Sequence, residues 1–339
     1  MRLNIGLGNY DRTAPLLDGR IGVQGADITV QSPPLEELFE RAFDKGEFDV
    51  AELSFSNYVY LTSESRCPYV ALPIFPSRTF RHSAIYVRAD KNIRSPRDLI
   101  GRLVGVREYS MTAALMARGV LEDDFGVAAS AIRWRYGRAE ANEASPVVRM
   151  KPRGVEAESI AEQDNLSDLL EVGKIDALVA YKPPSCFVQG VSGVQKVRRL
   201  FPDHVAAERD YYARTGIFPI MHLMAVKREL ADKHPHLCVA VCNAFEQARR
   251  LAFAALESHS SLAVALPWAL ANLAEARALM GQDYWPYGIE RNRAAIEAVA
   301  RYSAAQGLAS CVLGVDELFA RSTLDWSPLQ APAPAVAAH

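Results

Sequence analysis

The chain has 339 residues, of which 50% are hydrophobic and 23% charged, and its formal net charge is −2. This length suits two lobes of about 100–200 residues each better than one ordinary core. The near-neutral charge excludes the general attraction to nucleic acid or anionic lipid that a strongly basic protein has. We therefore expect neither a nucleic acid nor a membrane as a partner.

The chain carries no sign of export. The residues at its start read as a strand, with no basic and apolar leader before them, and no stretch reaches the roughly 18 consecutive apolar residues of a membrane span. The five cysteines are odd in number and scattered, which favours reduced thiols over a disulfide framework. We therefore expect a cytoplasmic protein.

Short apolar strands alternate with helices in the first part of the chain. We predict strands at residues 3–8, Asp27–Gln31 and 49–55, and a helix at residues 35–44. Thr13 precedes Pro15 and is expected to cap a short helix. The helix at 35–44 gathers its apolar side chains on one face, as a helix packed on a sheet does. This alternation indicates a largely parallel sheet.

A long extended segment at residues 69–88 then leads out of the first lobe. The second lobe is predicted to hold strands at 99–106, 131–136 and 175–181 and helices at 112–124 and 166–172. The chain returns near residues 216–227, and helices follow at 235–258, 261–273 and 289–306. We therefore expect one lobe from residues 1–85 and 216–330, a second lobe from residues 86–215, and a disordered tail at residues 331–339.

A lobe that the chain enters, completes and leaves requires two crossings, which gives a hinged pair of lobes with a cleft between them. In open α/β sheets, ligands lie beyond the carboxyl ends of the strands, where the N–H groups of the following helices converge. This rule selects three loops as candidate ligand sites, at residues 9–13, 54–57 and 108–112.

Six short segments at these loops and crossings carry a family resemblance. They are Glu52-Leu53-Ser54-Phe55-Ser56, Phe80-Arg81-His82-Ser83, Gly105-Val106-Arg107-Glu108-Tyr109, Met111-Thr112-Ala113 with Arg118-Gly119, Gly173-Lys174-Ile175-Asp176-Ala177 and Gly216-Ile217-Phe218-Pro219-Ile220-Met221-His222. In these segments the chain resembles 4,5-dihydroxyphthalate decarboxylases, enzymes with the type II periplasmic-binding-protein fold. The resemblance implies a two-lobed α/β fold with two crossover segments and a helical C-terminal region. Fold alone does not fix function.

The loops supply candidate groups that bind substrate. Asn9, Asp11, Ser54 and Ser56 suit hydrogen bonds to phenolic or carboxylate oxygens, although turn formation and helix capping explain them equally well. In the third loop, hydroxyl groups precede a helix whose first amides favour an anion, with ordinary N-capping as the alternative. The residues of that loop are Tyr109, Ser110 and Thr112, together with Glu108 as a candidate proton carrier or phenol acceptor.

The first crossing contributes Arg78 and Arg81, whose guanidinium groups can clamp carboxylates through paired hydrogen bonds. Ion pairs with surface carboxylates are the alternative. His82 follows on the same crossing, and His222 lies on the other. In a regular strand, Arg81 and His82 point to opposite faces, so ordinary packing brings only one of them to the ligand.

The resemblance implies decarboxylation of 4,5-dihydroxyphthalate to 3,4-dihydroxybenzoate (protocatechuate) and CO2 in phthalate catabolism, with no cofactor. Histidine transfers protons near neutral pH, so we expect His82 or His222 to protonate the ring, with Glu108 as a weaker candidate. Arg78 or Arg81 would hold the carboxylate that remains. The alternative function is a solute-binding protein that delivers a small aromatic carboxylate to an ABC transporter.

No metal site is assigned from the sequence. His234, His236, Cys238 and Cys242 lie close together, but their spacing matches no standard zinc site. The expected partners are a small aromatic carboxylate as the substrate and further copies of the chain in a homo-oligomer.

Overall fold

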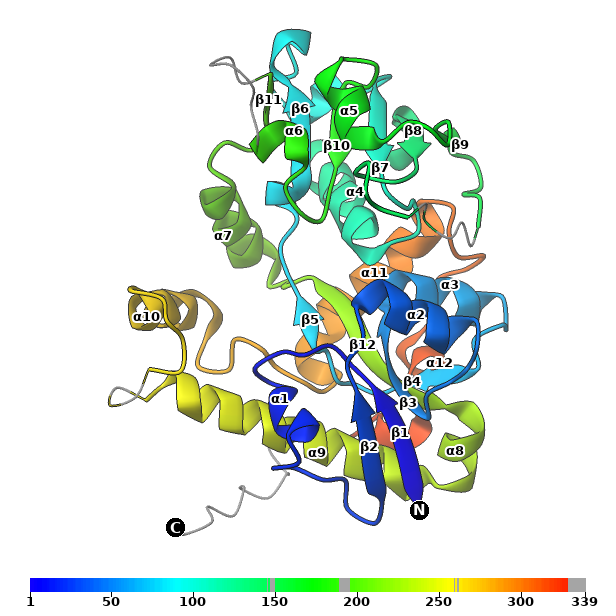
Figure 1. Cartoon of the computed structure of the whole chain (residues 1–339), viewed down its shortest axis with the longest axis vertical. Helices are drawn as coiled ribbons and strands as arrows, with labels where there is room; N and C mark the ends of the chain where they lie inside the picture. The colour runs from blue at the N-terminus through cyan, green and yellow to red at the C-terminus, as the bar shows by residue number, and fades with distance from the viewer. Residues whose placement is uncertain (145, 147–149, 189–195, 259, 261, 329–339) are drawn as a thin grey trace.

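Two six-stranded mixed sheets, each flanked by helices, form the two lobes of the protein (Figure 1). The computed structural model describes residues 1–144, 146, 150–188, 196–258, 260 and 262–328. The predicted disordered tail at 331–339 lies outside these residues, and the lobe boundaries at 85 and 216 stay a prediction. Among the described residues, no helix is long and apolar enough to cross a membrane.

The first sheet is parallel only in its N-terminal part. Its strands are β1 (Arg2–Gly6), β2 (Asp27–Gln31), β3 (Val50–Ser54), β4 (Tyr69–Ala71), β5 (Ser77–Arg78) and β12 (Ile220–Lys227). Their order is β2–β1–β3–β12–β4, and β5 also pairs with β12. Strand β1 runs parallel to β2 and β3, whereas β12 runs antiparallel to β3, β4 and β5. The prediction of a largely parallel sheet therefore holds for the first three strands only, because the returning chain inserts β12 in the opposite direction.

The second sheet has the order β11–β6–β10–β7–β8–β9. Its strands are β6 (Ile85–Arg88), β7 (Leu103–Val106), β8 (Arg133–Tyr136), β9 (Ala157–Ser159), β10 (Ala177–Val179) and β11 (Val197–Arg199). Strand β7 is parallel to β10 and β8, and β6 is antiparallel to β10 and β11. The carboxyl end of β7 points toward the first lobe and leads into the third predicted loop.

Most helices lie close to their predicted positions. They are α1 (Ala14–Leu17), α2 (Leu35–Phe43), α3 (Phe55–Ser63), α4 (Thr112–Phe125), α5 (Leu166–Glu171), α6 (Ser185–Val188), α7 (His204–Thr215), α8 (Arg228–Lys233), α9 (Pro235–Leu256), α10 (Ala269–Met280), α11 (Arg293–Ala305) and α12 (Val315–Leu318). The predicted helix at 261–273 is wrong in its bounds, because α10 occupies residues 269–280. The sequence analysis missed α3, α6, α7, α8 and α12.

Thr13 does not cap α1 as predicted. Its hydroxyl accepts a hydrogen bond from the Tyr10 N–H at 2.9 Å and donates to the Gly8 carbonyl at 2.6 Å. The side chain therefore closes the loop after β1 instead of satisfying the helix N-terminus. This loop geometry brings Tyr10 back over Gly8, beside the buried strand β3.

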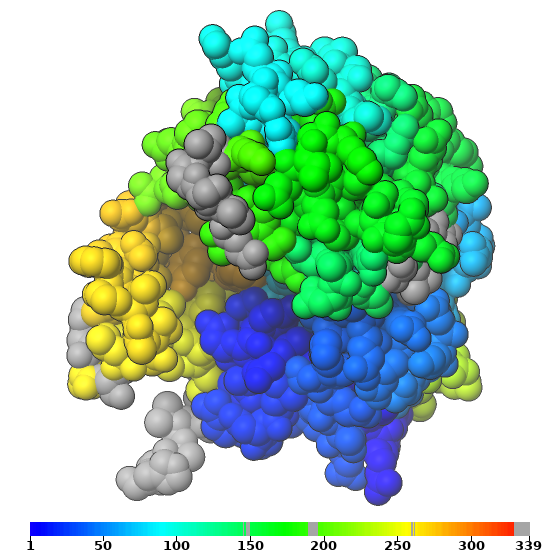
Figure 2. Space-filling model, turned by 45° about the horizontal axis from the view of Figure 1, so that its top comes forward, coloured from blue at the N-terminus to red at the C-terminus, as the bar shows by residue number. Residues whose placement is uncertain are grey.

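Helix α11 joins the lobes in addition to the two crossings, because it packs against both α3 and α4. Arg118 of α4 is buried and donates through Nε to the side-chain oxygen of Gln306, directly after α11, at 2.6 Å. Arg301 pairs with Asp123 of α4 at 2.6 Å. In Figure 2 the green residues of the second lobe lie against the blue residues of the first lobe.

Candidate active site

A cavity of about 230 Å³ lies where the two lobes meet. The first lobe contributes α2, the start of α3, β5, β12 and the segment before β6. The second lobe contributes the β7–α4 loop, the start of α4, and Tyr181, which follows β10. The polar or charged residues that line it are Glu36, Ser54, Asn57, Ser77, Arg81, Arg107, Glu108, Thr112, Tyr181 and His222. Its apolar wall is formed by Leu35, Phe39, Met111, Ala113 and Met221. The cavity is smaller than the usual pocket for a drug-sized ligand, but its mixed apolar and polar lining is that of a small-molecule site.

An irregularity in β12 brings His222 into this cavity. His222 pairs with Ser54 of β3 on one side and with Ser77 of β5 on the other, and the pairing with β5 shifts register between Ile220 and His222. Neighbouring side chains of a regular strand point to opposite faces, but a bulge redirects them. Met221 and His222 therefore both line the cavity.

The imidazole of His222 is held from behind by Glu52. His222 Nδ1 lies 2.7 Å from Glu52 Oε1, and the edge of the ring packs against Phe39. Glu52 Oε1 also accepts a hydrogen bond from the Tyr10 hydroxyl at 2.8 Å, and Oε2 accepts one from the Gly8 N–H at 2.8 Å. Burial and the nearby Glu52 carboxylate raise the pKa of the Tyr10 hydroxyl well above its usual value, so Tyr10 remains a donor.

The sequence analysis missed Glu52 and Tyr10 as functional residues. A signal for Glu52 was present, because it is a carboxylate in the middle of the apolar stretch Val50–Ser54, all five residues of which are buried. A charge in such a strand needs specific partners. For Tyr10 the sequence gives no comparable signal, because its contact depends on the fold of the preceding loop.

Hydroxyl groups from both lobes meet at one wall of the cavity. The hydroxyls of Ser54 and Thr112 lie 3.0 Å apart, and the Thr112 hydroxyl also accepts a hydrogen bond from the Ser56 N–H at 3.0 Å. Glu108 Oε1 accepts hydrogen bonds from Asn57 Nδ2 at 3.2 Å and from the Ser110 hydroxyl at 2.5 Å. The structure therefore brings together two of the three predicted loops.

Arg81 places a partly buried positive charge at the cavity. Its Nε lies 3.2 Å from the sulfur of Met221, and none of the described carboxylates lies within ion-pair distance of its guanidinium group. Burial lowers the pKa of Arg81 to about 10, so the group remains protonated at neutral pH. Arg107, which the sequence analysis did not select, adds a second guanidinium group from the other lobe, 3.4 Å from Glu143.

A scan against protein-family models finds no match. The 4,5-dihydroxyphthalate decarboxylase of Comamonas testosteroni is 40% identical to this chain over 326 residues, which cover 96% of the chain and 98% of that protein. The chain belongs to the 4,5-dihydroxyphthalate decarboxylase family. The 4,5-dihydroxyphthalate decarboxylase of Pseudomonas putida is also 40% identical, over 213 residues that cover 62% of this chain and 81% of that protein.

Solved structures confirm the fold predicted for this family member. The periplasmic aliphatic sulphonate-binding protein SsuA from Escherichia coli matches with a TM-score of 0.53 and 15% identity, covering 95% of this chain and 98% of that one. The alkanesulfonate-binding protein SsuA from Xanthomonas axonopodis pv. citri, bound to MOPS, matches with a TM-score of 0.51 and 15% identity, covering 94% and 97%. At this identity the matches show the two-lobed periplasmic-binding-protein-type fold alone.

Arg78 does not reach the cavity of this 4,5-dihydroxyphthalate decarboxylase family member, so its predicted role as a carboxylate anchor is corrected. Its guanidinium group is buried and donates to the carbonyls of Phe218 at 3.0 Å and Pro286 at 2.9 Å, and to the side-chain oxygen of Asn292. These acceptors come from the second crossing and from the segment before α11. Arg78 therefore ties distant parts of the first lobe together.

His82 also points away from the cavity, so its predicted role as the proton donor is corrected. Its ring is 2% exposed and packs against Phe201 at 5.2 Å and Tyr211 at 5.4 Å between ring centres. The neighbouring Arg81 lines the cavity. The strand expected at these two residues is absent, because Arg81 precedes a short 3₁₀ helix at His82–Ala84, so strand alternation is not what separates the two side chains. His82 belongs to the packing of the first crossing against the second lobe.

Five predicted substrate-binding residues of the decarboxylase family member likewise do not line the cavity. The Tyr109 hydroxyl donates to the Gln306 carbonyl at 3.1 Å, and the hydroxyl of Ser110 is bound to Glu108. Ser56 is fully buried behind the wall. Asn9 and Asp11 are exposed on the loop after β1, where Asp11 pairs with Arg12. Neither Ser110 nor Thr112 caps α4, because Met111 takes that position.

His82 is expected to make stability depend on pH. Burial lowers the pKa of His82 to about 4, whereas an unfolded histidine titrates near 6.5. The unfolded state therefore binds the proton first, and the folded state loses about 2–3 kcal/mol of stability as pH falls from about 6.5 to about 4. In His82→Gln this share of the pH dependence should vanish in urea unfolding, while decarboxylase turnover is retained. Unchanged pH dependence would contradict the role of His82 in stability, and lost turnover would contradict its placement outside the active site.

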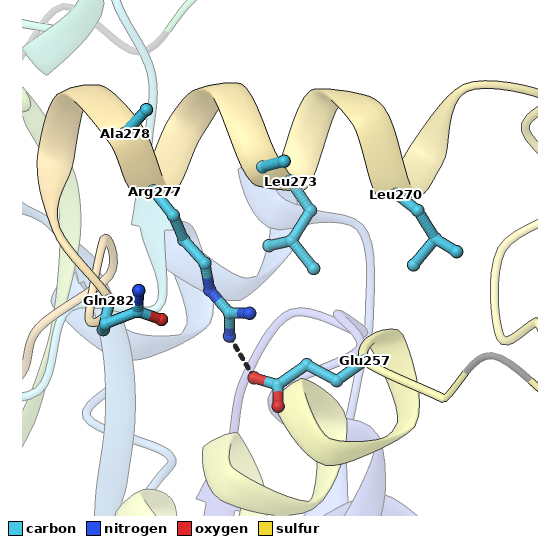
Figure 3. Close-up of a pocket in the computed structure, with 7 residues that line it drawn as sticks. Glu257, Leu270, Leu273, Arg277, Ala278 and Gln282 are labelled. Carbon is cyan, nitrogen blue, oxygen red and sulfur yellow. Dashed lines mark hydrogen bonds and ion pairs between the residues drawn. The ribbon is translucent and has the colours of Figure 1, made fainter.

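A second hollow, of about 580 Å³, lies between α9 and α10. Figure 3 shows Leu270 and Leu273 pointing from α10 into it, and Arg277 reaching across to Glu257. These two charged groups pair with each other, and none of the described residues that line the hollow is a histidine or a serine. It therefore lacks the chemistry of the cavity between the lobes.

Proposed function

We propose that this protein releases CO2 from a hydroxylated aromatic dicarboxylate, with 4,5-dihydroxyphthalate as the substrate and 3,4-dihydroxybenzoate as the product. Its 40%-identical relatives carry the name of this decarboxylase. The observation that carries the proposal is that one cavity is lined by Arg81, a partly buried cation that pairs with none of the described carboxylates, and by His222, whose imidazole Glu52 fixes.

The chemistry requires a proton donor to ring carbon. Direct loss of CO2 would leave an anion in the plane of the ring, whereas a hydroxyl para to the carboxylate offers an easier route. The phenol loses its proton, its electrons move to the ring carbon that bears the carboxylate, and that carbon accepts a proton. The bond to CO2 then breaks, its electron pair restores the aromatic ring, and the phenolate oxygen takes back a proton. Acid and base groups placed in this way accelerate such steps.

The lining residues suit these roles. His222 presents the ring nitrogen that Glu52 does not hold, and it donates the proton to carbon. Glu108, on the opposite lobe, accepts the phenolic proton. Arg81 binds the carboxylate that remains, through charge-assisted hydrogen bonds. The hydroxyls of Ser54 and Thr112 orient the diol.

Capture of an aromatic carboxylate for a transporter is the alternative function. Arg81 would serve such a binder equally well, but a binder does not need an imidazole whose second nitrogen is fixed by a buried carboxylate. The relatives at 40% identity are decarboxylases, so the enzyme is the better supported function.

Turnover distinguishes the two functions. Purified protein is incubated with 4,5-dihydroxyphthalate, with and without a chelator, while CO2 and 3,4-dihydroxybenzoate are measured. We expect equal amounts of both products and saturation with substrate, and no CO2 from phthalate, which lacks the para hydroxyl. Saturable binding without product would overturn the proposal. Loss of activity with chelator would contradict the expectation that no metal is needed.

The proposal includes two further expectations from the sequence. The five cysteines are free, which suits a reducing compartment such as the cytoplasm. The homo-oligomeric state remains a proposal, which light scattering of the purified protein tests.

A further inference from the structure

Glu52 is an unusual buried charge. It lies at the centre of β3 with 0% exposure, and a carboxylate in such a place is costly unless hydrogen bonds and charges compensate it. Among the described residues, no lysine or arginine pairs with it, and its one ionisable partner within ion-pair distance is His222. Strongly buried charges beside a cavity are frequent at functional sites.

The donors around Glu52 determine which nitrogen of His222 carries a proton. Oε2 accepts from the Gly8 N–H, and Oε1 accepts from the Tyr10 hydroxyl. The Gly8 N–H can only donate, and the Tyr10 hydroxyl donates to Glu52 in this arrangement. With Glu52 as the acceptor of both, His222 Nδ1 is the donor of the third hydrogen bond. The other nitrogen, Nε2, is then left for the cavity.

Gly8 allows this arrangement by having no side chain. A Cβ atom at Gly8 would lie 2.6 Å from the ring of Tyr10, which is closer than real contacts allow. Tyr10 folds back over Gly8 and reaches Glu52 only because the position is glycine. The contact between Gly8 and Tyr10 therefore explains why glycine occupies this position.

We propose that Glu52 is a positioning residue for the proton transfer, fixing the tautomer and the orientation of His222, and that Tyr10 and Gly8 hold Glu52 in that role. The inference rests on the proposed function. A carboxylate behind a histidine orients the ring and makes it a better proton carrier, as outer partners do at other histidine sites.

Other charged and titratable groups face the same cavity. Glu52 and Tyr10 lie behind its wall, and the groups that line it are Glu36 of α2, Arg81 before β6, Arg107 and Glu108 of the β7–α4 loop, and Tyr181 after β10. Of these groups, Glu52 alone is within hydrogen-bond distance of the imidazole. A change at Glu52 therefore acts on His222 more directly than a change at any other group.

The test is the variant Glu52→Gln, which keeps the size of the side chain but offers one acceptor oxygen in place of two. We expect kcat to fall by about 10–100-fold, the size of effect that such outer partners have, with little change in KM. Because the hydrogen bond from Nδ1 to a carboxylate is lost, we expect the pH dependence of kcat to differ from that of the wild type. In ¹⁵N NMR, wild-type His222 should show the Nδ1–H tautomer and the variant a mixture.

Glu246→Gln is a matched control, because Glu246 is also 0% exposed but pairs with Arg249 and Arg250 on α9. It should lose stability while keeping the pH profile and the His222 tautomer. Should Glu52→Gln fail to fold, Tyr10→Phe removes one donor and keeps the ring; we expect a threefold to tenfold lower kcat, on the scale of one hydrogen bond, and a changed tautomer.

The inference is overturned if Glu52→Gln, or Tyr10→Phe in its place, keeps the wild-type kcat, pH profile and tautomer while His222→Gln is inactive. Retained activity in His222→Gln would instead remove the proposed proton donor, and this inference with it. The two failures are therefore distinguishable.

Discussion

Replacing His222 by glutamine is expected to lower kcat for CO2 release by about 10²–10⁴-fold, with a small effect on KM. Glutamine has nearly the same reach and can still donate to Glu52, whose Oε1 lies 2.7 Å from Nδ1 of the wild-type ring. It cannot carry a proton to the substrate, so the chemical step fails while the cavity keeps its shape. Steady-state production of 3,4-dihydroxybenzoate gives both constants.

His82→Gln is the matched control for this experiment, because both histidines lie on the crossings but only His222 lines the cavity. We expect His82→Gln to turn over substrate at the wild-type rate. Equal activity of the two variants would remove His222 from the mechanism and leave Glu108 as the candidate proton donor.

Replacing Arg81 by methionine is expected to raise KM by about 30- to 1,000-fold, since truncating one member of a buried charged pair costs about 2–4 kcal/mol. Arg81 is partly buried, and none of the described carboxylates pairs with it, so we expect the substrate to supply the compensating charge. Methionine fills the space without a charge, and kcat should change much less than KM. Calorimetry with phthalate, which we expect to bind without reacting, measures the affinity directly.

The same substitution should also raise the melting temperature of the ligand-free protein slightly, because it removes a partly buried cation that has no ion-pair partner among the described residues. Arg78→Met is the contrasting variant: Arg78 donates to carbonyls of the protein itself, so its loss should lower stability and leave KM unchanged. A rise in KM for Arg78→Met, with none for Arg81→Met, would reverse the assignment of the two arginines.

The sequence predicted where the site lies better than it predicted which residues line it. The sequence analysis expected only one of Arg81 and His82 to face the cavity, and Arg81 alone lines it. The strand alternation behind that expectation is absent, because His82–Ala84 form a 3₁₀ helix, and the sequence could not say which residue would face the ligand. That choice depends on Phe201 and Tyr211, which pack around His82 and come from a segment more than a hundred residues away.

For the same reason, the sequence could not show which of Arg78 and Arg81 lines the cavity. Arg78 and Arg81 have similar neighbours in the sequence, yet the acceptors of Arg78 are at Phe218, Pro286 and Asn292. The loop rule succeeded at the carboxyl ends of β3 and β7, because parallel strands place their ends at one edge. It failed after β1, where Tyr10 supports Glu52 from behind instead of touching the cavity.

Glu52 could have been found from the sequence. A carboxylate within Val50–Ser54 conflicts with the apolar pattern of a buried strand, and the conflict marks a functional position more clearly than the polar loops do. The sequence gives no comparable signal for the bulge in β12 that lets Met221 and His222 both line the cavity.

The contacts between the two lobes differ in strength between the α11 side and the α2 side of the cavity. On the α11 side, separation would strip buried Arg118 of its bond to Gln306, at a cost of several kcal/mol. On the α2 side, we find a hydrogen bond at the exposed margin, from the Tyr181 hydroxyl to Glu36 at 3.2 Å, worth about 1 kcal/mol. We therefore expect the lobes to separate first at the α2 margin while α11 keeps its contacts, so that the dicarboxylate and the released CO2 pass beside Tyr181.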